Sequence, residues 1–287
     1  MDIGSNTTRL LVAECRADGS IRELMTQRVY TRLGKALGKD RALPPEKVLE
    51  VAAVVEQQVR HARELGAGQV RVVATAAIRQ AANREQLVRE IERAAGVAAE
   101  VLSDEDEARL AFAGATRMLA AAPGGAIAVV DVGGGSTEIA IGTLARGVTW
   151  SRSFRIGSGF LADSYLRSDP PAASELDAVR HHAAGVFEGL KAPAVERAVA
   201  CGGSAASLRR MAGAELTHDA LERAVRLLAS APRADIAERF ELDPERVHLL
   251  PAGVLILDAV STELGASLKI GGGGLREGVV LELSGAG

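Results

Sequence analysis

A stretch of twelve residues near the amino terminus is repeated, in pattern, in the middle of the chain. Residues 2–13, with the sequence DIGSNTTRLLVA, align without a gap on residues 131–142, with the sequence DVGGGSTEIAIG. Aspartate, glycine and threonine occupy the same offsets in both copies, and apolar, small and hydroxyl-bearing residues match around them. Each copy predicts a strand that ends in a carboxylate, a tight glycine turn and a second apolar strand. The repeat therefore predicts a fold built by internal duplication.

The residue types in these turns suit phosphate. Glycine allows successive amide N–H groups to point into one concavity, which fits phosphate oxygens. Two such turns facing each other would hold a phosphate chain, and Asp2 and Asp131 are the hard oxygen ligands that Mg²⁺ or Mn²⁺ takes. The alternative for each copy is an aspartate that caps its own turn in an ordinary hairpin. We assign to phosphate binding the residues Gly4, Ser5, Asn6, Thr7, Gly133, Gly134, Gly135, Ser136 and Thr137.

The order of predicted elements supports two domains. A length of 287 residues suggests about two domains of roughly 150 residues each. Strands grouped first and then interleaved with helices occur twice, which predicts two α/β domains over residues 1–121 and 122–287, joined near residues 123–125. Only Met1 precedes Asp2, whereas Ala126–Val130 precede Asp131, so we expect the first strand to be truncated.

We expect strands over residues 8–15, 21–30, 70–74, 99–102, 126–130, 137–141, 148–155, 198–201 and 268–270. We expect helices over residues 44–65, 83–95, 103–121, 159–166 and 173–190, a helix that begins at 204, three helical stretches within 217–264, and a last helix after 274.

Composition narrows the possible partners. The net charge of −3 gives no overall basic footprint, so we expect no nucleic-acid partner, and a polyanionic substrate would need a local cluster. Cys15 and Cys201 are too few for a disulfide framework or a zinc site and fit a reducing cytosol. We expect no membrane span, which needs an apolar run of ~18 residues, and no secretory leader. These features together predict a cytoplasmic protein.

Six motifs in order carry a resemblance to a known family. They are the turn at 2–9, ATAAIR at 74–79, the acidic run at 103–109, the turn at 131–138, CGGS at 201–204 and GGLREG at 273–278. Over essentially its whole length the chain resembles the exopolyphosphatase/guanosine pentaphosphate phosphohydrolase family, within the actin-like ATPase superfamily. The resemblance implies two duplicated actin-like (ribonuclease H-like) domains with an interdomain cleft. It also implies Mg²⁺-dependent hydrolysis of the terminal phosphoanhydride of inorganic polyphosphate or guanosine pentaphosphate by water.

The acidic run at 103–109 holds the catalytic carboxylate that the resemblance implies. Taken alone, the run is typical of a charged first helical turn. The family pattern is Ser-Gly-x-Glu-Glu-Ala, and matching it backwards from Ala108 assigns Glu107 as the general base that polarises the attacking water. The chain departs from the pattern at Asp106, where the family has glutamate, and at Asp104, where it has glycine.

Four further positions have two interpretations each. By resemblance, Glu138 orients the attacking water or a metal-bound water, and Arg79 contacts phosphate unless it is simply solvated. Arg9 follows the first turn and either contacts phosphate or pairs with a carboxylate. The CGGS turn at 201–204 is either an anion site at a helix start or a remnant of the superfamily fold.

The fold leaves three functions open. The leading hypothesis is a phosphohydrolase acting on polyphosphate, in particular short chains, or on guanosine pentaphosphate. A kinase of the same superfamily and a non-catalytic sensor of polyphosphate or (p)ppGpp are the alternatives. A homodimer is a further expectation.

Overall fold

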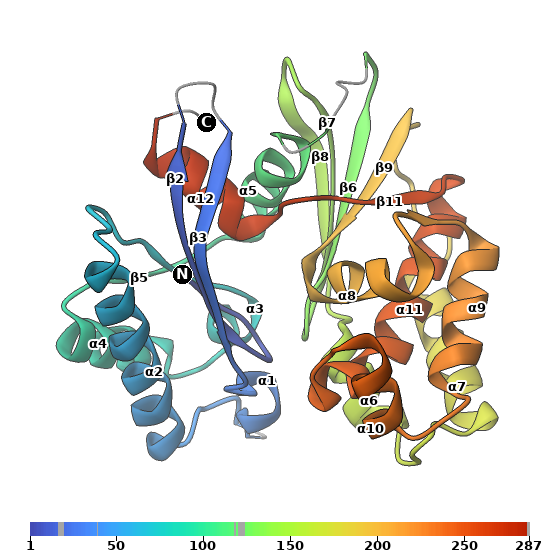
Figure 1. Ribbon diagram of the computed structural model, residues 1–287, viewed down its shortest axis with the longest axis horizontal. Coiled ribbons are helices and arrows are strands. Elements are labelled where there is room, and N and C mark those ends of the chain that lie inside the picture. Colours follow the sequence, from blue (N-terminus) through green and yellow to red (C-terminus); the bar gives the residue numbers. More distant parts are fainter. Residues whose placement is uncertain (17–19, 39, 118, 120–123, 286–287) are drawn as a thin grey trace.

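The chain forms two α/β lobes, each built on one β-sheet (Figure 1). The structure, a computed structural model, describes residues 1–16, 20–38, 40–117, 119 and 124–285. Sheet A takes its strands from residues 2–101, and sheet B from residues 127–270. The division that the sequence predicts therefore separates the strands of the two sheets.

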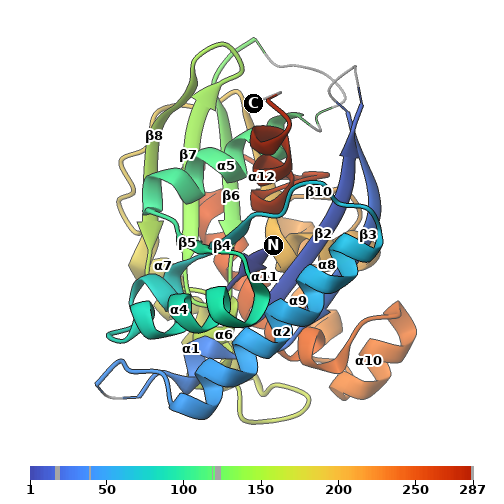
Figure 2. The ribbon, with the colours of Figure 1, turned by 90° about the vertical axis from the view of Figure 1, so that its left-hand side faces the viewer.

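Sheet A has five strands in the order β3-β2-β1-β4-β5. Strand β1 pairs antiparallel with β2 and parallel with β4, so it occupies the centre. The long helices α2 and α4 cover the outer face of the sheet (Figure 2). The elements of this lobe are β1 (Asp2–Ile3), β2 (Thr8–Cys15), β3 (Ile21–Val29), α1 (Leu33–Ala36), α2 (Pro45–Glu64), β4 (Val72–Ala74), α3 (Ala76–Arg79), α4 (Arg84–Ala95) and β5 (Ala99–Val101).

Sheet B has six strands in the order β10-β11-β9-β6-β7-β8. Its central strand β6 pairs antiparallel with β7 and parallel with β9. A larger helical layer packs on this sheet around the buried helix α11. The elements are β6 (Ile127–Val132), β7 (Thr137–Thr143), β8 (Gly147–Phe154), α6 (Ser158–Tyr165), α7 (Ala173–Phe187), β9 (Arg197–Cys201), α8 (Gly202–Ala212), β10 (Glu215–Leu216), α9 (His218–Leu228), α10 (Arg233–Phe240), α11 (Pro244–Leu264) and β11 (Leu268–Ile270).

The register of the two central hairpins confirms the predicted duplication. In sheet A, Asp2 lies opposite Arg9. In sheet B, Asp131 lies opposite Glu138, at the same separation of seven residues along the chain. The two central strands differ in length, because β1 has two residues and β6 has six.

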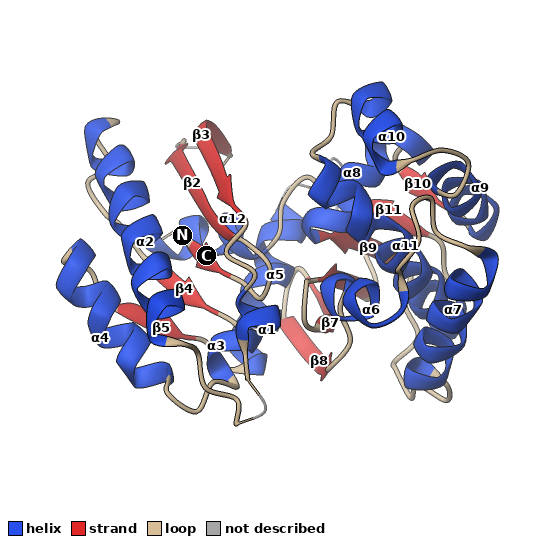
Figure 3. Ribbon diagram, turned by 90° about the horizontal axis from the view of Figure 1, so that it is seen from below, coloured by secondary structure: helices blue, strands red, loops and turns tan. Residues whose placement is uncertain are grey.

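Two helices cross between the lobes, at the centre of Figure 3. Helix α5 (Asp104–Arg117) follows sheet A but packs on strands of sheet B, where Phe112 joins a cluster with Ile127 and Val129. Helix α12 (Leu275–Leu283) follows sheet B but packs against α5 and β2. The helices touch backbone to backbone, since a Cβ on Gly278 would lie 1.9 Å from the carbonyl oxygen of Leu110. The domain boundary predicted at residue 121 separates the two sheets. It does not separate the helices, because α5 packs on the second lobe and α12 packs on the first.

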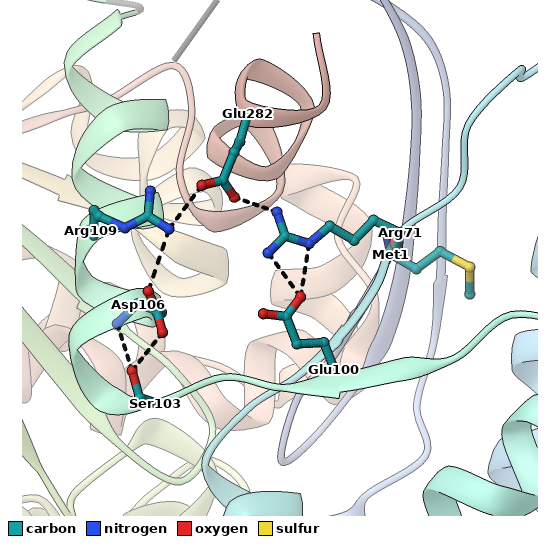
Figure 4. Close-up of polar contacts among 7 residues, drawn as sticks. All are labelled: Met1, Arg71, Glu100, Ser103, Asp106, Arg109 and Glu282. Carbon is teal, nitrogen blue, oxygen red and sulfur yellow. Dashed lines mark hydrogen bonds and ion pairs between the residues drawn. The ribbon is translucent and has the colours of Figure 1, made fainter. Parts of the chain in front are cut away.

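Polar side chains fasten α12 to both of its neighbours (Figure 4). Arg71, just before β4, pairs with Glu100 of β5 at 2.8 Å and also with Glu282 of α12. The other oxygen of Glu282 accepts from Arg109 of α5 at 2.9 Å. One carboxylate therefore links sheet A, α12 and α5.

Helix α11 bears on the expectation of no membrane span, which stays a prediction. Among the described helices it is the one long and apolar enough to span a bilayer by length and composition, with a mean hydropathy of 1.4. Its most apolar window is 72% buried inside the lobe, and residues such as Leu250 and Ile256 are fully enclosed. Packing of this kind is typical of the core helix of a globular lobe.

Short elements account for most other differences from the predicted pattern. The single turns α1 and α3 and the two-residue strand β10 are too short to show a hydrophobic period. Residues 118 and 120–123 lie outside the described residues, and they include the end of the helix predicted at 103–121 and Pro123 of the predicted linker. The predicted strands and longer helices agree with the structure to within a few residues at their ends.

Candidate active site

Both glycine turns line one cavity of about 170 Å³ between the lobes. This cavity, here called the cleft, has walls from several parts of the chain that are distant in sequence. Asp2, Arg9, Glu107, Asp131 and Glu138 supply its charged groups nearest the turns. The remaining walls include Gly4–Thr7, Gly133, Gly134, Ser136, Cys201–Gly203, Arg246 and Gly271–Glu277.

The two turns have the same internal hydrogen bond. The amide of Gly4 donates to the carbonyl of Thr7 at 3.0 Å, and the amide of Gly133 donates to the carbonyl of Ser136 at 2.9 Å. Each turn therefore closes the hairpin that begins at its aspartate. The structural equivalence of the copies extends from the strands into the turns.

The tips of the turns abut each other across the cleft. A Cβ added to Gly134 would lie 2.9 Å from the Cβ of Asn6, and one added to Gly135 would lie 2.6 Å from Oγ of Ser5. Side chains at these two positions would push the turns apart. Glycine at 134 and 135 is therefore required for the approach of the two turns, a reason that the sequence alone does not give.

Asp2 and Asp131 face the same cleft. Oδ1 of Asp2 is buried and has no hydrogen-bond partner among the described residues. Burial raises the pKa of Asp2, opposed chiefly by the positive charge of Arg9. Burial, and then the negative charge of Asp2, raise the pKa of Asp131 to about 6. The two carboxylates therefore repel each other, and their charges call for a cation.

The donor set fits a hard divalent cation. Two carboxylates, one with an unpaired oxygen, match the few protein ligands that Mg²⁺ takes alongside water and phosphate. A separate trio, His218, Glu222 and Asp258, also brings three ligand atoms within 4.8 Å of one another. Arg180 pairs with Glu222 at 2.7 Å and with Asp258 at 3.5 Å, so this trio is engaged in ion pairs outside the cleft.

Glu107 is the carboxylate of the acidic run that reaches the cleft. It is 8% exposed, and Oε2 accepts from Nη1 of Arg79 at 2.9 Å. Burial raises the pKa of Glu107 to about 7, opposed first by the charge of Arg79. Asp106 points elsewhere, accepting from Oγ of Ser103 at 2.8 Å and pairing with Arg109 at 3.4 Å. Glu107 is therefore buried at the cleft, whereas its neighbour Asp106 is engaged in polar contacts away from it.

Arg79 lies behind Glu107 and is not one of the residues that line the cleft. Its Nη1 also donates to the carbonyl of Leu102 at 2.8 Å, and its Nη2 pairs with Asp104. Asp104, the position at which the family pattern has glycine, therefore helps to fix Arg79. Contact between Arg79 and phosphate stays a prediction, whereas its contact with Glu107 is direct.

Glu138 lies on β7 and is 4% exposed. Its Oε1 accepts from Oγ of Ser153 on the neighbouring strand β8 at 3.0 Å. Burial, and then the charge of Glu107, raise the pKa of Glu138 well above its usual range. Thr137, next to it, is fully buried and donates to the carbonyl of Ile156 at 2.7 Å, so this hydroxyl holds the hairpin and does not line the cleft.

The far wall of the cleft holds groups that sequence reasoning missed. Arg246 of α11 is 6% exposed, and a Cβ on Gly203 would lie 2.7 Å from its Nη2. Its Nε and Oγ of Ser204 are buried without a partner among the described residues. The amino-terminal end of α8 lies here too, and such ends favour anions. In the sequence, the CGGS turn was the only motif of this wall that pointed to an anion site, and no motif pointed to Arg246.

Arg276 and Glu277 complete the wall from the start of α12. Glu277 accepts from the amide of Gly274 at 2.8 Å, which fixes the glycine loop at residues 271–274. Burial raises the pKa of Asp2, and the charge of Arg276 opposes this rise, after the larger opposing effect of Arg9. The GGLREG motif therefore contributes to the cleft through charge as well as through close packing.

Two pseudo-symmetric lobes around an acidic, glycine-lined cleft define a protein of the actin-like class. The sequence signature of the Ppx/GppA phosphatase family matches residues 11–285, and the chain belongs to that family.

Similar proteins agree with this assignment. Exopolyphosphatase 1 of Mycobacterium tuberculosis is 26% identical over 298 residues, which cover 98% of this chain and 86% of that protein. The crystal structure of the Ppx/GppA family member of Aquifex aeolicus is 27% identical, with a TM-score of 0.81 and coverage of 99% of this chain and 95% of that one. An exopolyphosphatase from Cytophaga hutchinsonii, 20% identical with a TM-score of 0.85, covers 100% of this chain and 97% of that one and shares the fold.

Proposed function

We propose that the protein is an exopolyphosphatase, which releases the terminal phosphate of inorganic polyphosphate by attack of water. The observation that carries this proposal is the presence of Glu107 and both glycine turns in one cleft. Membership of a phosphatase family and likeness to proteins named exopolyphosphatase support it. Guanosine pentaphosphate, which ends in the same kind of phosphoanhydride, is the second substrate that we propose.

Glu107 acts as the general base. Its carboxylate accepts a proton from the attacking water, whose oxygen forms a bond to the terminal phosphorus while the bond to the bridging oxygen breaks. The shortened polyphosphate leaves with that oxygen and its electron pair. A base with a pKa of about 7 is matched to this task near neutral pH. Arg79, through its hydrogen bond to Oε2, fixes which oxygen of Glu107 faces the water.

Asp2 and Asp131 would hold a divalent cation, Mg²⁺ or Mn²⁺, when it is bound. That cation supplies charge neutralisation for the phosphate oxygens. The turns at Gly4–Thr7 and Gly133–Ser136 would hold the terminal phosphate through backbone amides and hydroxyls. Ser5, Asn6, Thr7 and Ser136 carry side-chain donors in the two turns, and the hydroxyl of Ser136 also hydrogen-bonds Glu138.

Glu138 and Glu107 have distinct roles because two negative charges buried close together repel each other, so that ionising both carboxyl groups costs free energy. The charge of Glu107 raises the pKa of Glu138, which is buried and bonded to Ser153. We assign the proton of the pair to Glu138, which then orients the water as a hydrogen-bond donor. Glu107, paired with the guanidinium of Arg79, remains free to accept.

A cytoplasmic location is part of the proposal. Cys15 and Cys201 are free thiols, and Cys201 is buried beside Asp131 in the cleft. Unpaired thiols of this kind fit a reducing compartment.

The test is phosphate release from polyphosphates of defined length, beside guanosine pentaphosphate, with Mg²⁺, with Mn²⁺ and with a chelator. We expect release from polyphosphate that the chelator abolishes. Tight binding of these ligands without any release would favour a sensor. Release or transfer that needs ATP and an added acceptor would identify a kinase.

A further inference from the structure

Cys201 lies beside Asp131, one of the two aspartates to which we assign the cation. It is the last residue of β9, and the parallel register of β9 and β6 sets it directly against Asp131 (Figure 1). Cys201 is 2% exposed and lines the cleft. Its side chain hydrogen-bonds the carboxyl group of Asp131. An ionised carboxylate only accepts hydrogen bonds, so the thiol is the donor.

Two glycines border the carboxyl group of Asp131. A Cβ on Gly202 would lie 2.2 Å from Oδ1 of Asp131, which is too close for any side chain. A Cβ on Gly274 would lie 3.5 Å from Sγ of Cys201 and 4.0 Å from Oδ2 of Asp131. Gly274 therefore faces both groups, and the thiol and the carboxyl group border the same part of the cleft.

The first copy of the duplication has no such donor. Strand β4 sets Val73 against Asp2 in the register in which β9 sets Cys201 against Asp131. Val73 is fully buried, and its side chain has no hydrogen to donate. Oδ1 of Asp2 is buried without a partner among the described residues. The two aspartates therefore differ, because a neighbouring strand supplies a hydrogen bond to Asp131 but not to Asp2.

We propose that Cys201 is a positioning residue, whose S–H group holds the carboxyl group of Asp131 in the orientation that binds the divalent cation. The inference rests on the proposed function, because it takes Asp2 and Asp131 as the ligands of that cation. The sulfur itself stays outside the coordination shell and acts through Asp131. Hydrogen-bond partners of metal ligands fix the orientation of the ligand, and their loss typically weakens metal binding by about 10–100-fold.

The test measures Mn²⁺ binding in the absence of substrate, through the electron paramagnetic resonance signal of free Mn²⁺. Cys201→Ala removes the donor, and Cys201→Ser keeps a donor at the same place. Cys15→Ala is the matched control, since Cys15 is also a free cysteine and lies outside the cleft. Asp131→Asn shows whether the bound Mn²⁺ lies in the cleft.

Cys201→Ala should raise the Kd for Mn²⁺ by roughly 10-fold or more. Cys201→Ser and Cys15→Ala should leave the Kd near that of the unaltered chain. Serine and alanine are both smaller than cysteine, so a loss caused by packing alone would appear in both Cys201 variants. An unchanged Kd for Cys201→Ala, or an equal rise for Cys201→Ala and Cys201→Ser, would overturn the proposal. Should Cys201→Ala not fold, Cys201→Val, which copies Val73 of the first copy, must show the same rise.

Two further results separate this inference from the proposed function. A Kd that Asp131→Asn leaves unchanged would place the cation elsewhere, and would contradict the proposed function and this inference together. Titration with Cd²⁺ tests whether the sulfur is itself a ligand, since a thiolate bound to cadmium absorbs in the ultraviolet. We expect no such band. A band that Cys201→Ser abolishes and Cys15→Ala retains would overturn the positioning role while leaving the cation site at Asp131 in place.

Discussion

The guanidinium of Arg79 donates from Nη1 to Oε2 of Glu107 across 2.9 Å and pairs through Nη2 with Asp104. Arg79 thereby connects helix α3, which follows β4, with the first turn of α5. The pairing holds a carboxylate of raised pKa at the wall of the cleft. In the proposed mechanism, the general base Glu107 is therefore positioned by an arginine behind it.

Loss of the base should abolish turnover while leaving the cleft intact. We expect Glu107→Gln to lower the rate of phosphate release by on the order of 10²–10⁴ and to retain polyphosphate binding. The matched control is Asp106→Asn, which removes the adjacent carboxylate that faces Ser103 and Arg109. Activity that falls equally in both variants would contradict the assignment of Glu107.

Removing Arg79 should change the pH dependence as well as the rate. Arg79→Gln removes the positive charge that holds the pKa of Glu107 down, so the apparent pKa should rise above its present value of about 7. The rising limb of kcat/KM should accordingly move to higher pH, measured by phosphate release from pH 5 to pH 9. Arg89→Gln, an exposed change on α4, serves as control and should leave the profile in place. A loss of rate with an unmoved limb would mean that Arg79 acts on phosphate and not through Glu107.

In the unaltered protein, the pKa of Glu107 sets the pH at which kcat/KM stops rising. A general base works in its deprotonated form, and burial raises the pKa of Glu107 to about 7. We therefore expect kcat/KM to increase about tenfold per pH unit below pH 7 and to level off above it. A rate that is flat from pH 5 to pH 8 would show that no group of this pKa must lose its proton.

Arg246 should govern binding at the far wall of the cleft. Arg246 is buried beside the start of α8, where charge-assisted hydrogen bonds from its guanidinium to phosphate would contribute about 1.5–3 kcal/mol, or roughly 10–100-fold in affinity. We expect Arg246→Gln to raise KM for polyphosphate by that factor, with a smaller effect on kcat. The exposed Arg223→Gln on α9 is the matched control. An unchanged KM would place the substrate elsewhere in the cleft.

The crossing of α5 and α12 depends on Gly278. Because its Cβ would lie 1.9 Å from a backbone oxygen of Leu110, Gly278→Ala should lower the free energy of unfolding by about 1–3 kcal/mol or more. Gly185→Ala, on the open face of α7 with no atom within 4 Å, should instead raise it by about 0.5–1 kcal/mol. Chemical denaturation of both variants measures the difference. Equal effects would show that the crossing tolerates a side chain.

The duplication made much of this fold predictable. Its signal is local, because a strand, a turn and a strand occupy twelve adjacent residues, and the structure repeats their register in both sheets. Asp2 and Asp131 were predicted from the same turns, whereas Glu107 and Glu138 were assigned through the resemblance to the family, and Glu277 was not predicted. Contacts between distant segments gave no such signal. Nothing in the sequence around Arg246 points to the start of α8, and nothing around Gly278 points to α5.

Close packing also altered what some predicted residues do. Gly134 and Gly135 were assigned to phosphate, yet they also let the two turns touch. Thr137 holds its hairpin through a buried hydrogen bond. These roles depend on the partner surface, which no single segment specifies.

Crystals of the Glu107→Gln variant grown with Mn²⁺ and a short polyphosphate would test the central claim most directly, through the anomalous scattering of manganese. The account predicts one manganese peak bound by Asp2 and Asp131, with the terminal phosphate between the turns at Gly4–Thr7 and Gly133–Ser136. Manganese bound elsewhere, for example at His218, Glu222 and Asp258, with the polyphosphate outside the cleft, would contradict it.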